Sequence, residues 1–175
     1  QLPSEPIAGE NFPSGRDWVN LPAKWTLKLE SPFGETLTLN DATAGSLSES
    51  DDPFVRHFSG TMTYTAEVKL PAAPKGKHVM LDLGSVGDMA EVRVNGILAG
   101  GVWTAPYTVD ITDHIRKNVN RLEIQIVNNW NNRLIGDATL PEHERLTSLP
   151  VHTTSAASPL QPSGLLTQPR LILMP

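Results

Sequence analysis

The sequence predicts an all-β domain, a sandwich or barrel of antiparallel strands, and three observations lead to that prediction. Apolar and polar residues alternate with a period of two in several short segments, and successive side chains of a strand point to opposite faces of a sheet. The chain has 13 glycines and 15 prolines among its 175 residues, which favours many turns. No long window carries an apolar stripe at the 3.6-residue period of a helix.

Each expected strand shows one apolar and one polar face, as in a sheet with one side on a core and one side in water. In chain order these strands cover residues 25–29, 64–70, 79–83, 90–94, 122–127 and 170–174. Asn95-Gly96 lies between Val94, the end of one of these strands, and Ile97, and this dipeptide is the strongest short signal of a β-hairpin because both residues tolerate positive φ. Residues 41–60 are predicted to be a polar loop. Residues 131–163 are predicted to be a long irregular loop, which in a compact β domain is usually functional.

Composition excludes several classes of function. The 14 Lys and Arg against 19 Asp and Glu give a formal net charge of −5, and such a chain is a poor ligand for nucleic acid or an anionic membrane. The absence of cysteine from the sequence excludes a disulfide framework, a thiolate zinc site and a cysteine nucleophile. No apolar run approaches the roughly 20 residues of a membrane-spanning helix. We therefore expect no nucleic-acid partner and no membrane insertion.

The sequence carries no complete catalytic motif. Pro-Glu-His-Glu-Arg at 141–145 lacks the second histidine of a zinc protease, and no Gly-x-Ser-x-Gly elbow or phosphate-binding loop occurs. Paired carboxylates for glycosidic cleavage stay open, because such partners need only meet in space. Asp52, Asp110 and Asp113 are better interpreted as turn and capping residues.

One cluster rich in aromatic and amide side chains points to a ligand. Its residues are Trp103, Tyr107, Asn129, Trp130, Asn131, Arg133 and Asp137. An aromatic face covers the apolar side of a sugar ring, while amide, guanidinium and carboxylate groups bind its hydroxyls. The plain alternative is a sandwich corner in which Trp130 closes one end and Arg133 braces Asp137, an ion pair worth under about 1 kcal/mol if exposed. Trp18 and Trp25 are expected in the core.

The order of three stretches resembles the sugar-binding domain of family 2-type glycoside hydrolases. The stretches are FSGTMTYTAEVKLP at 58–71, LDLGSVGDMAEVRVNGILAGGVWTAPYTVDITDHI at 81–115 and NRLEIQIVNNWNNRLIGD at 120–137. The segment NNWNNRLIGD and the closing SPLQPSGLLTQPRLI at 158–172 are more similar to the C-terminal module of bacterial α-L-rhamnosidases of glycoside hydrolase family 106. This resemblance implies a galactose-binding-like jelly-roll β-sandwich of two antiparallel sheets over residues 18–175. Residues 1–17 are then an N-terminal extension.

One departure from the family pattern concerns the turn before Asn120. Relatives usually carry glycine ahead of that asparagine, whereas this chain has Lys117-Asn118-Val119. We expect Asn118 to supply the positive φ instead, because asparagine tolerates it better than most residues.

The resemblance also implies a function. In relatives, an aspartate after the last strand that contains tryptophan reaches the neighbouring catalytic barrel and touches the sugar, and Asp137 occupies a comparable position. Carried over, this makes Trp130, Arg133 and Asp137 a sugar-side or barrel-facing edge. The catalytic carboxylates belong to a barrel of about 250 residues, more than this chain holds. The implied protein is a non-catalytic module of an exported bacterial glycoside hydrolase, periplasmic or extracellular, partnered by carbohydrate and by the catalytic domain of the same parent chain.

Two alternatives stay open beside this reading, and no cofactor is expected. An independent carbohydrate-binding module or lectin predicts saturable sugar binding that is lost in Trp130→Ala or Trp103→Ala. A purely structural spacer predicts no sugar binding and a large apolar patch where a partner domain sits. A structural calcium ion is a minor expectation, with Glu67, Asp82 and Asp88 as its candidate ligands. The chain opens without a signal sequence and without an initiator methionine, so we expect a mature form or a piece of a longer protein.

Overall fold

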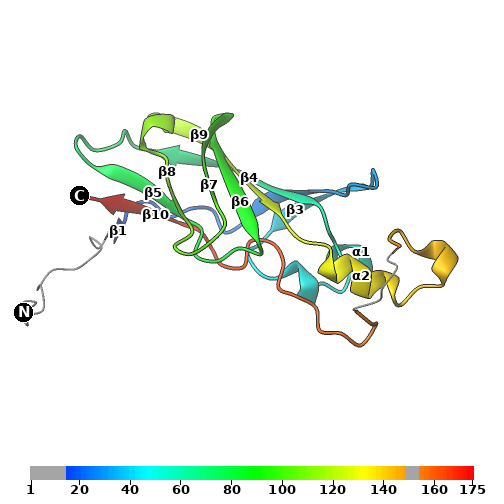
Figure 1. Cartoon of the computed structure of the whole chain (residues 1–175). Coiled ribbons are helices and arrows are strands. Elements are labelled where there is room, and N and C mark those ends of the chain that lie inside the picture. The colour runs from blue at the N-terminus through cyan, green and yellow to red at the C-terminus, as the bar shows by residue number, and fades with distance from the viewer. Residues whose placement is uncertain (1–14, 149–153) are drawn as a thin grey trace, which may run out of the picture.

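The computed structural model describes residues 15–148 and 154–175, which fold into two antiparallel sheets (Figure 1). One sheet has four strands in the order β1 (Arg16–Asp17), β10 (Arg170–Met174), β5 (His78–Asp82) and β8 (Thr108–Asp110). The other has six, in the order β3 (Thr36–Ala42), β2 (Trp25–Glu30), β4 (Thr61–Leu70), β9 (Asn118–Val127), β6 (Met89–Val94) and β7 (Ile97–Val102). The all-β prediction is therefore confirmed. Of the predicted extension 1–17, only the last three residues lie within the described part of the chain.

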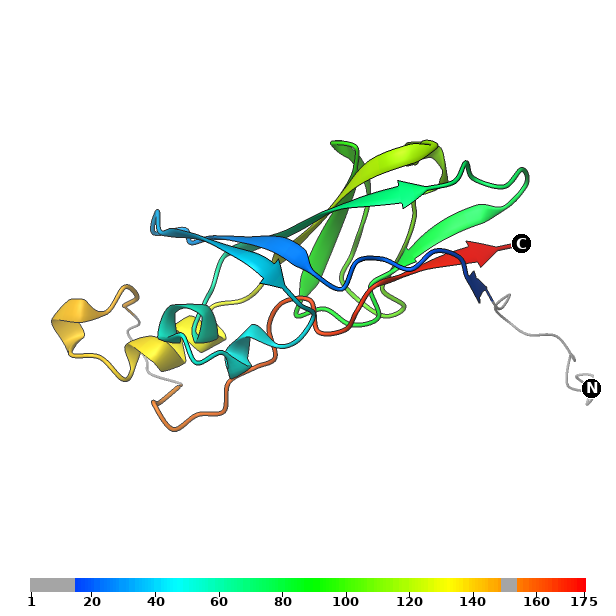
Figure 2. The same cartoon turned by 180° about the vertical axis from the view of Figure 1, so that it is seen from behind.

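Figure 2 shows the two sheets from behind, and the buried apolar side chains of the core lie between them. Leu27, Tyr64, Ile124 and Val92 form one cross-strand row over β2, β4, β9 and β6, and all four are fully buried. Their neighbours along each strand point to the opposite side, which gives the alternating burial that the sequence predicts. Trp25 is buried in this core as expected. Trp18 is partly buried and packs against it, and its N–H donates a hydrogen bond to the Leu171 carbonyl.

Two turns have the geometry that their residues predict. Asn95 and Gly96 have φ values of 55° and 82° and close the hairpin between β6 and β7. Asn118 has a φ of 80°, so it supplies the positive φ predicted for it. Asn120, two residues later, is fully buried. Its side chain accepts a hydrogen bond from the Arg116 N–H and donates one to the Arg116 carbonyl, which fixes the start of β9.

Short helices lie where the sequence predicts only loops. They are η1 (Leu47–Glu49), α1 (Pro53–Arg56), η2 (Thr112–His114), α2 (Asn131–Asp137) and η3 (Glu142–Glu144). None exceeds two turns, so their residues cannot show the repeated spacing by which a helix is recognised. Asp52 caps α1 as predicted, because its carboxylate accepts a hydrogen bond of 2.8 Å from the Phe54 N–H. Among the described residues, no helix is both long and apolar enough to cross a membrane.

Four strands lie outside the six predicted ranges: β1, β3, β7 and β8. The hairpin signal at Asn95-Gly96 predicts the presence of β7 but not its bounds. β3 alternates Thr and Leu but stays only half-buried at the edge of the six-stranded sheet. β1 pairs Arg16 with Leu173 and Asp17 with Ile172, so the end of the predicted extension joins the four-stranded sheet. A two-residue strand carries no periodic signal, which is why pairing alone identifies it.

Candidate functional site

The candidate site begins where the chain leaves β9 and enters α2, at the end of the sandwich where α1 and α2 lie side by side (Figures 1 and 2). Gly136 of α2 packs on the ring of His57, which directly follows α1. A Cβ built on Gly136 would lie 2.7 Å from Cγ of His57. The absence of a side chain at this position thus allows the two helices to touch.

Asn128, the first of the four asparagines in this segment, stabilises the fold through hydrogen bonds of its side chain. Its side-chain oxygen accepts a hydrogen bond of 2.9 Å from the Gly60 N–H. Its amide nitrogen donates to the Phe58 carbonyl at 2.8 Å and to the Ser163 hydroxyl at 2.9 Å. These three bonds occupy the amide and tie the end of β9 to two other segments of the chain.

The amide side chains of Asn129 and Asn132 also form hydrogen bonds within the protein. The Asn129 N–H donates to the Asp88 carboxylate at 2.7 Å, and its amide nitrogen donates to the Gln161 side-chain oxygen at 3.0 Å. Asn132 and Gln161 exchange two hydrogen bonds of 2.8 Å through the Asn132 amide and the Gln161 backbone. Asn131 donates its N–H to the Asn129 side-chain oxygen at 2.9 Å. The side chains of Asn129 and Asn132 thus hold segments of this chain together, and a sugar contact of Asn129 or Asn131 stays a prediction.

Arg133 and Asp137 form a buried ion pair within α2. Arg133 Nη2 lies 3.0 Å from Asp137 Oδ1, and the two side chains keep only 13% and 3% of their surface exposed. Asp137 Oδ2 also accepts hydrogen bonds from the N–H and the hydroxyl of Thr147, at 2.8 and 2.6 Å. The pair therefore faces the interior of this chain, and the sugar contact expected of Asp137 stays a prediction.

His57 completes this cluster of charged groups. Its Nδ1 lies 3.0 Å from the Pro53 carbonyl oxygen, so the ring donates there when Nδ1 carries the proton. Burial lowers the pKa of His57 below its ordinary 6.5, and the positive charges of Arg133 and Arg56 lower it further. The cluster thus favours a neutral imidazole against α2.

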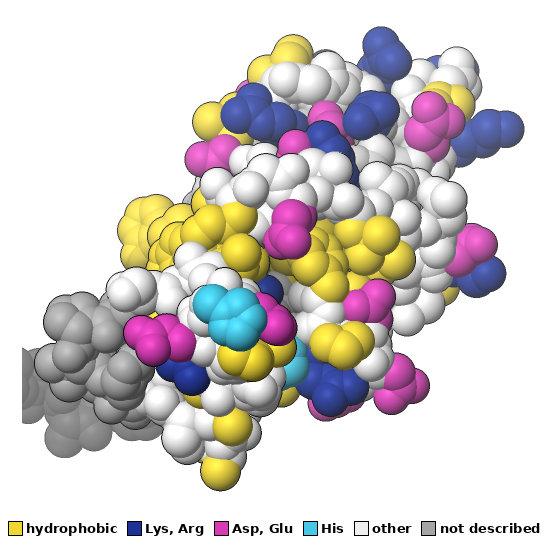
Figure 3. Space-filling view, turned by 90° about the vertical axis from the view of Figure 1, so that its right-hand side faces the viewer, with side chains coloured by type: hydrophobic (Ala, Val, Ile, Leu, Met, Phe, Trp, Pro, Cys, Tyr) yellow, Lys and Arg dark blue, Asp and Glu magenta, His cyan; other side chains and the backbone are white. Residues whose placement is uncertain are grey.

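Trp130 is the exposed member of the predicted edge. It keeps 45% of its surface accessible, and its ring meets Phe33 edge to face with the centroids 5.4 Å apart. Phe33 and Val127 are 41% and 40% exposed. Val127 and Trp130 border a hollow of about 410 Å³ that Pro32 and Gly60 also line. We call Phe33, Val127 and Trp130 the aromatic edge. Figure 3 shows hydrophobic side chains gathered in a band across one face of the molecule.

Trp103 and Tyr107, the other two predicted aromatics, lie apart from α2. Trp103 follows β7, is 76% exposed, and borders a second hollow of about 290 Å³ with Met89, Gln125 and Val127. Val127 lines both hollows, so Trp103 and Trp130 flank the same strand end. Tyr107 directly precedes β8 of the four-stranded sheet and packs against the core.

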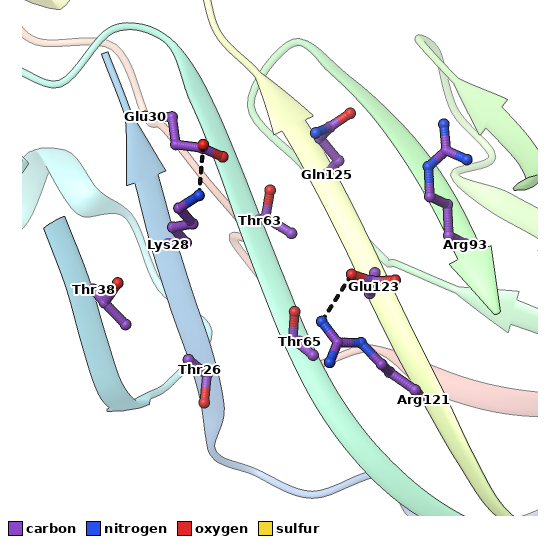
Figure 4. Close-up of a pocket in the computed structure, with 10 residues that line it drawn as sticks. All are labelled: Thr26, Lys28, Glu30, Thr38, Thr63, Thr65, Arg93, Arg121, Glu123 and Gln125. Carbon is purple, nitrogen blue, oxygen red and sulfur yellow. Dashed lines mark hydrogen bonds and ion pairs between the residues drawn. The ribbon is translucent and has the colours of Figure 1, made fainter. Parts of the chain in front are cut away.

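A third hollow, which the sequence analysis missed, lies on the outer face of the six-stranded sheet (Figure 4). We call this cavity of about 550 Å³ the outer groove. Ten polar residues line it: Thr26, Lys28, Glu30, Thr38, Thr63, Thr65, Arg93, Arg121, Glu123 and Gln125. The alternating segments place polar residues on the outward face of each strand, which is the sequence signal for this groove. The sequence alone does not show which strands become neighbours.

The three candidate calcium ligands have other partners or lie apart. Asp82 Oδ2 is 2.7 Å from Nη2 of Arg170, and Asp88 holds Asn129. Glu67 points outward from β4. Over residues 15–148 and 154–175, no group of three or more His, Cys, Asp or Glu is placed to hold a metal ion. Calcium binding stays a prediction.

The two antiparallel sheets form the β-sandwich of a galactose-binding-like domain. Residues 37–156 match the family model described as "Glycosyl hydrolase 2 galactose-binding domain-like". The chain belongs to this family, and the family resemblance and fold predicted from the sequence are confirmed.

Solved and curated relatives place this domain inside much longer chains. The structure of a rhamnosidase from Novosphingobium sp. PP1Y is similar over 98% of this chain and 16% of its own, with a TM-score of 0.82 and 35% identity. A protein of Formosa agariphila that carries the provisional name beta-glucuronidase is 34% identical over 128 residues, which are 70% of this chain and 11% of the relative. An FMN-binding beta-glucuronidase from Facaelibacterium prausnitzii L2-6 shares the fold over 90% of this chain and 22% of its own, with a TM-score of 0.57 and 22% identity.

Proposed function

We propose that this chain is a non-catalytic domain of a bacterial glycoside hydrolase, similar to the rhamnosidase, that packs on the catalytic domain and helps to shape its sugar site. The observation that carries the proposal is the aromatic edge, which leaves Phe33, Val127 and Trp130 exposed on one side of a well-packed domain. A contiguous exposed apolar surface typically marks a contact site. The rhamnosidase supplies the context, because a domain of this kind makes up 16% of that chain.

The composition of the edge suits contact with another domain of the same protein. Tryptophan and phenylalanine are enriched in the cores of interfaces because they bury a large apolar area with few rotatable bonds. Behind the edge, the ion pair between Arg133 and Asp137 and the packing of Gly136 on His57 hold α2 in place. A docking partner would thus meet a pre-formed surface, which lowers the entropy cost of association.

The test uses the full-length protein that carries this chain, with Phe33→Ala and Trp130→Ala combined. We expect a lower melting temperature of the catalytic domain and a lower kcat/KM, because the edge no longer supports the neighbouring sugar site. Leu98→Ala is the matched control, since Leu98 is 47% exposed on β7 and lies outside the edge. Unchanged melting and unchanged kinetics in the double variant would contradict the proposal.

The same experiment separates the structural spacer from the proposed role. A spacer also predicts the exposed apolar surface, so the surface alone does not distinguish the two. A spacer loses stability in the double variant but keeps the kcat/KM of the fraction that remains folded. A domain that shapes the sugar site loses both.

A further inference from the structure

The residues that line the outer groove differ in chemistry from those of the aromatic edge. All ten residues that line it are polar, and they come from five adjacent strands of the six-stranded sheet (Figure 4). Cross-strand pairing sets them in rows. Lys28, Thr63 and Gln125 are neighbours in one row, and Thr65 and Glu123 belong to the next. A row over four strands spans roughly 14 Å, since neighbouring strands lie about 4.8 Å apart.

The charges of the groove are matched within the protein. Lys28 Nζ lies 2.6 Å from Glu30, and Arg121 lies 3.1 Å from Glu123. Arg93, the remaining cation, is 3.7 Å from the carboxylate of its strand neighbour Glu91. A ligand bound by charge, such as a phosphate or a nucleic acid, would have to break these pairs. The groove therefore suits a ligand that brings hydroxyl groups and little net charge.

Neutral hydrogen-bonding groups are left free between these ion pairs. Four threonine hydroxyls and one glutamine amide line the groove: Thr26, Thr38, Thr63, Thr65 and Gln125. Among the ten residues that Figure 4 draws, side-chain hydrogen bonds join only Lys28 to Glu30 and Arg121 to Glu123, so these five groups have no partner among the groove residues. A hydroxyl both donates and accepts, as does an amide, and these are the partners that sugar hydroxyls use.

An apolar wall adjoins this row of polar groups. Gln125 lines both the outer groove and the smaller hollow beside it, where Trp103, Met89 and Val127 are exposed. Sugars present hydroxyls at their rims and C–H groups on their ring faces, so a polar floor beside an indole matches both. We infer that the outer groove is a binding site for an extended polysaccharide chain, with its hydroxyls on the threonine and Gln125 row and one ring against Trp103.

This inference goes beyond the proposed function. The two surfaces meet at Val127, but the groups assigned to the polysaccharide, which are the threonines, Gln125 and Trp103, lie outside the aromatic edge of Phe33, Val127 and Trp130. The test is isothermal titration of this chain with two neutral polysaccharides, arabinoxylan and galactomannan, and with the polyanion polygalacturonate. We expect saturable binding of at least one of the first two, with little dependence on salt concentration. Polygalacturonate tests for attraction by charge alone, which falls steeply as salt screens it.

Thr63→Val combined with Thr65→Val removes two hydroxyls while keeping the β-branched shape of each side chain. Affinity should fall about fivefold or more, since a hydrogen bond contributes about 1 kcal/mol. Trp103→Ala should weaken the same binding. Thr36→Val is the matched control, because Thr36 is an exposed β3 residue that does not line the groove.

Three outcomes would overturn the inference: no saturable binding of any of the three polymers, binding that both threonine substitutions leave unchanged, or binding of polygalacturonate alone that disappears with added salt. None of them would bear on docking through the aromatic edge, which is tested by the melting and kinetics of the full-length protein. The two proposals can therefore fail separately.

Discussion

The hydroxyl of Tyr64 connects the centre of the six-stranded sheet to the segment that precedes β10. Tyr64 is fully buried, and its oxygen accepts a hydrogen bond of 3.2 Å from the Leu165 N–H. A Cβ on Gly164 would lie 2.7 Å from that oxygen, so the backbone approaches it closely. Burial raises the pKa of Tyr64 to about 12, although the bond from Leu165 opposes the shift.

Tyr64→Phe tests this residue. The substitution leaves the buried Leu165 N–H without its acceptor, so we expect the free energy of unfolding to fall by about 1–3 kcal/mol in urea titrations. Tyr107→Phe, at a residue that is only partly buried, should change it by less than about 0.5 kcal/mol. Equal stability of Tyr64→Phe and the unmodified chain would remove the assigned role. In the unmodified chain stability should fall as pH rises from 10 towards 12, because the unfolded tyrosine ionises first.

Asn120 organises the turn before β9. Besides its two bonds to Arg116, it accepts a hydrogen bond from the Asn95 amide at 2.9 Å and donates to the Asn118 carbonyl at 3.0 Å. Asn120→Leu keeps the size but leaves Asn95, Arg116 and Asn118 without these hydrogen bonds, and we expect a loss of at least about 2 kcal/mol on chemical unfolding. Asn131→Leu, whose side chain is only partly buried, is the control. A stable Asn120→Leu variant would show that the network contributes little.

Residues whose structural roles depend on their own chemistry and on neighbours in the sequence were predicted correctly. Asn95, Gly96 and Asn118 have positive φ because of their own chemistry, and Asp52 caps a helix that starts at the next residue. The sequence could not show the hydrogen-bond partners of Asn129, because Asp88 and Gln161 lie 41 and 32 residues away. From the sequence alone, an amide side chain that bonds within the protein cannot be distinguished from one that binds a ligand.

At the scale of elements, α1 and α2 depend on each other through His57 and Gly136. The lowered pKa of His57 means that the unfolded chain binds a proton more readily than the folded one. Its contribution to stability is therefore complete above pH 6.5 and is lost as pH falls from there through the folded pKa. His57→Gln should flatten this decline in unfolding experiments across that window. His143→Gln, at an exposed position of η3, should leave it unchanged, and the opposite ranking would contradict the account.

Arg133→Met tests the buried ion pair in α2. The substitution leaves the Asp137 carboxylate buried without its cation, and we expect a loss of about 3 kcal/mol, at the low end for buried pairs because Arg133 keeps 13% of its surface in water. Lys24→Met removes an exposed pair with Asp41 and should cost less than about 1 kcal/mol. Similar losses in the two variants would show that burial of the pair has no energetic weight. The measurement is urea unfolding of each variant.

Strands with an alternating apolar and polar pattern were predictable, and the short helices were not. The strand at 170–174 was predicted with the bounds that the structure gives to β10. α2 has seven residues and begins at an asparagine with no side-chain cap, so its sequence resembles a loop. Since α2 carries Arg133 and Asp137, the site was harder to predict than the sheets that support it.

At the scale of the whole molecule, the fold followed from the sequence because a period of two dictates which face of every strand is buried. The strand order did not, and the outer groove is a property of that order: β2, β4, β9 and β6 are neighbours in space but not in sequence. The core was thus predictable from the sequence. The outer groove and the full set of residues in the aromatic edge follow only from how the strands assemble.

The central claim is that the aromatic edge of this domain is covered by the catalytic domain. Hydroxyl-radical footprinting measures it directly, because the oxidation rate of an aromatic side chain reports its exposure. Phe33 and Trp130 should react quickly in this chain alone and be protected in the full-length protein, while Leu98 reacts equally in both. Equal reactivity of Phe33 and Trp130 in the two samples would contradict the account.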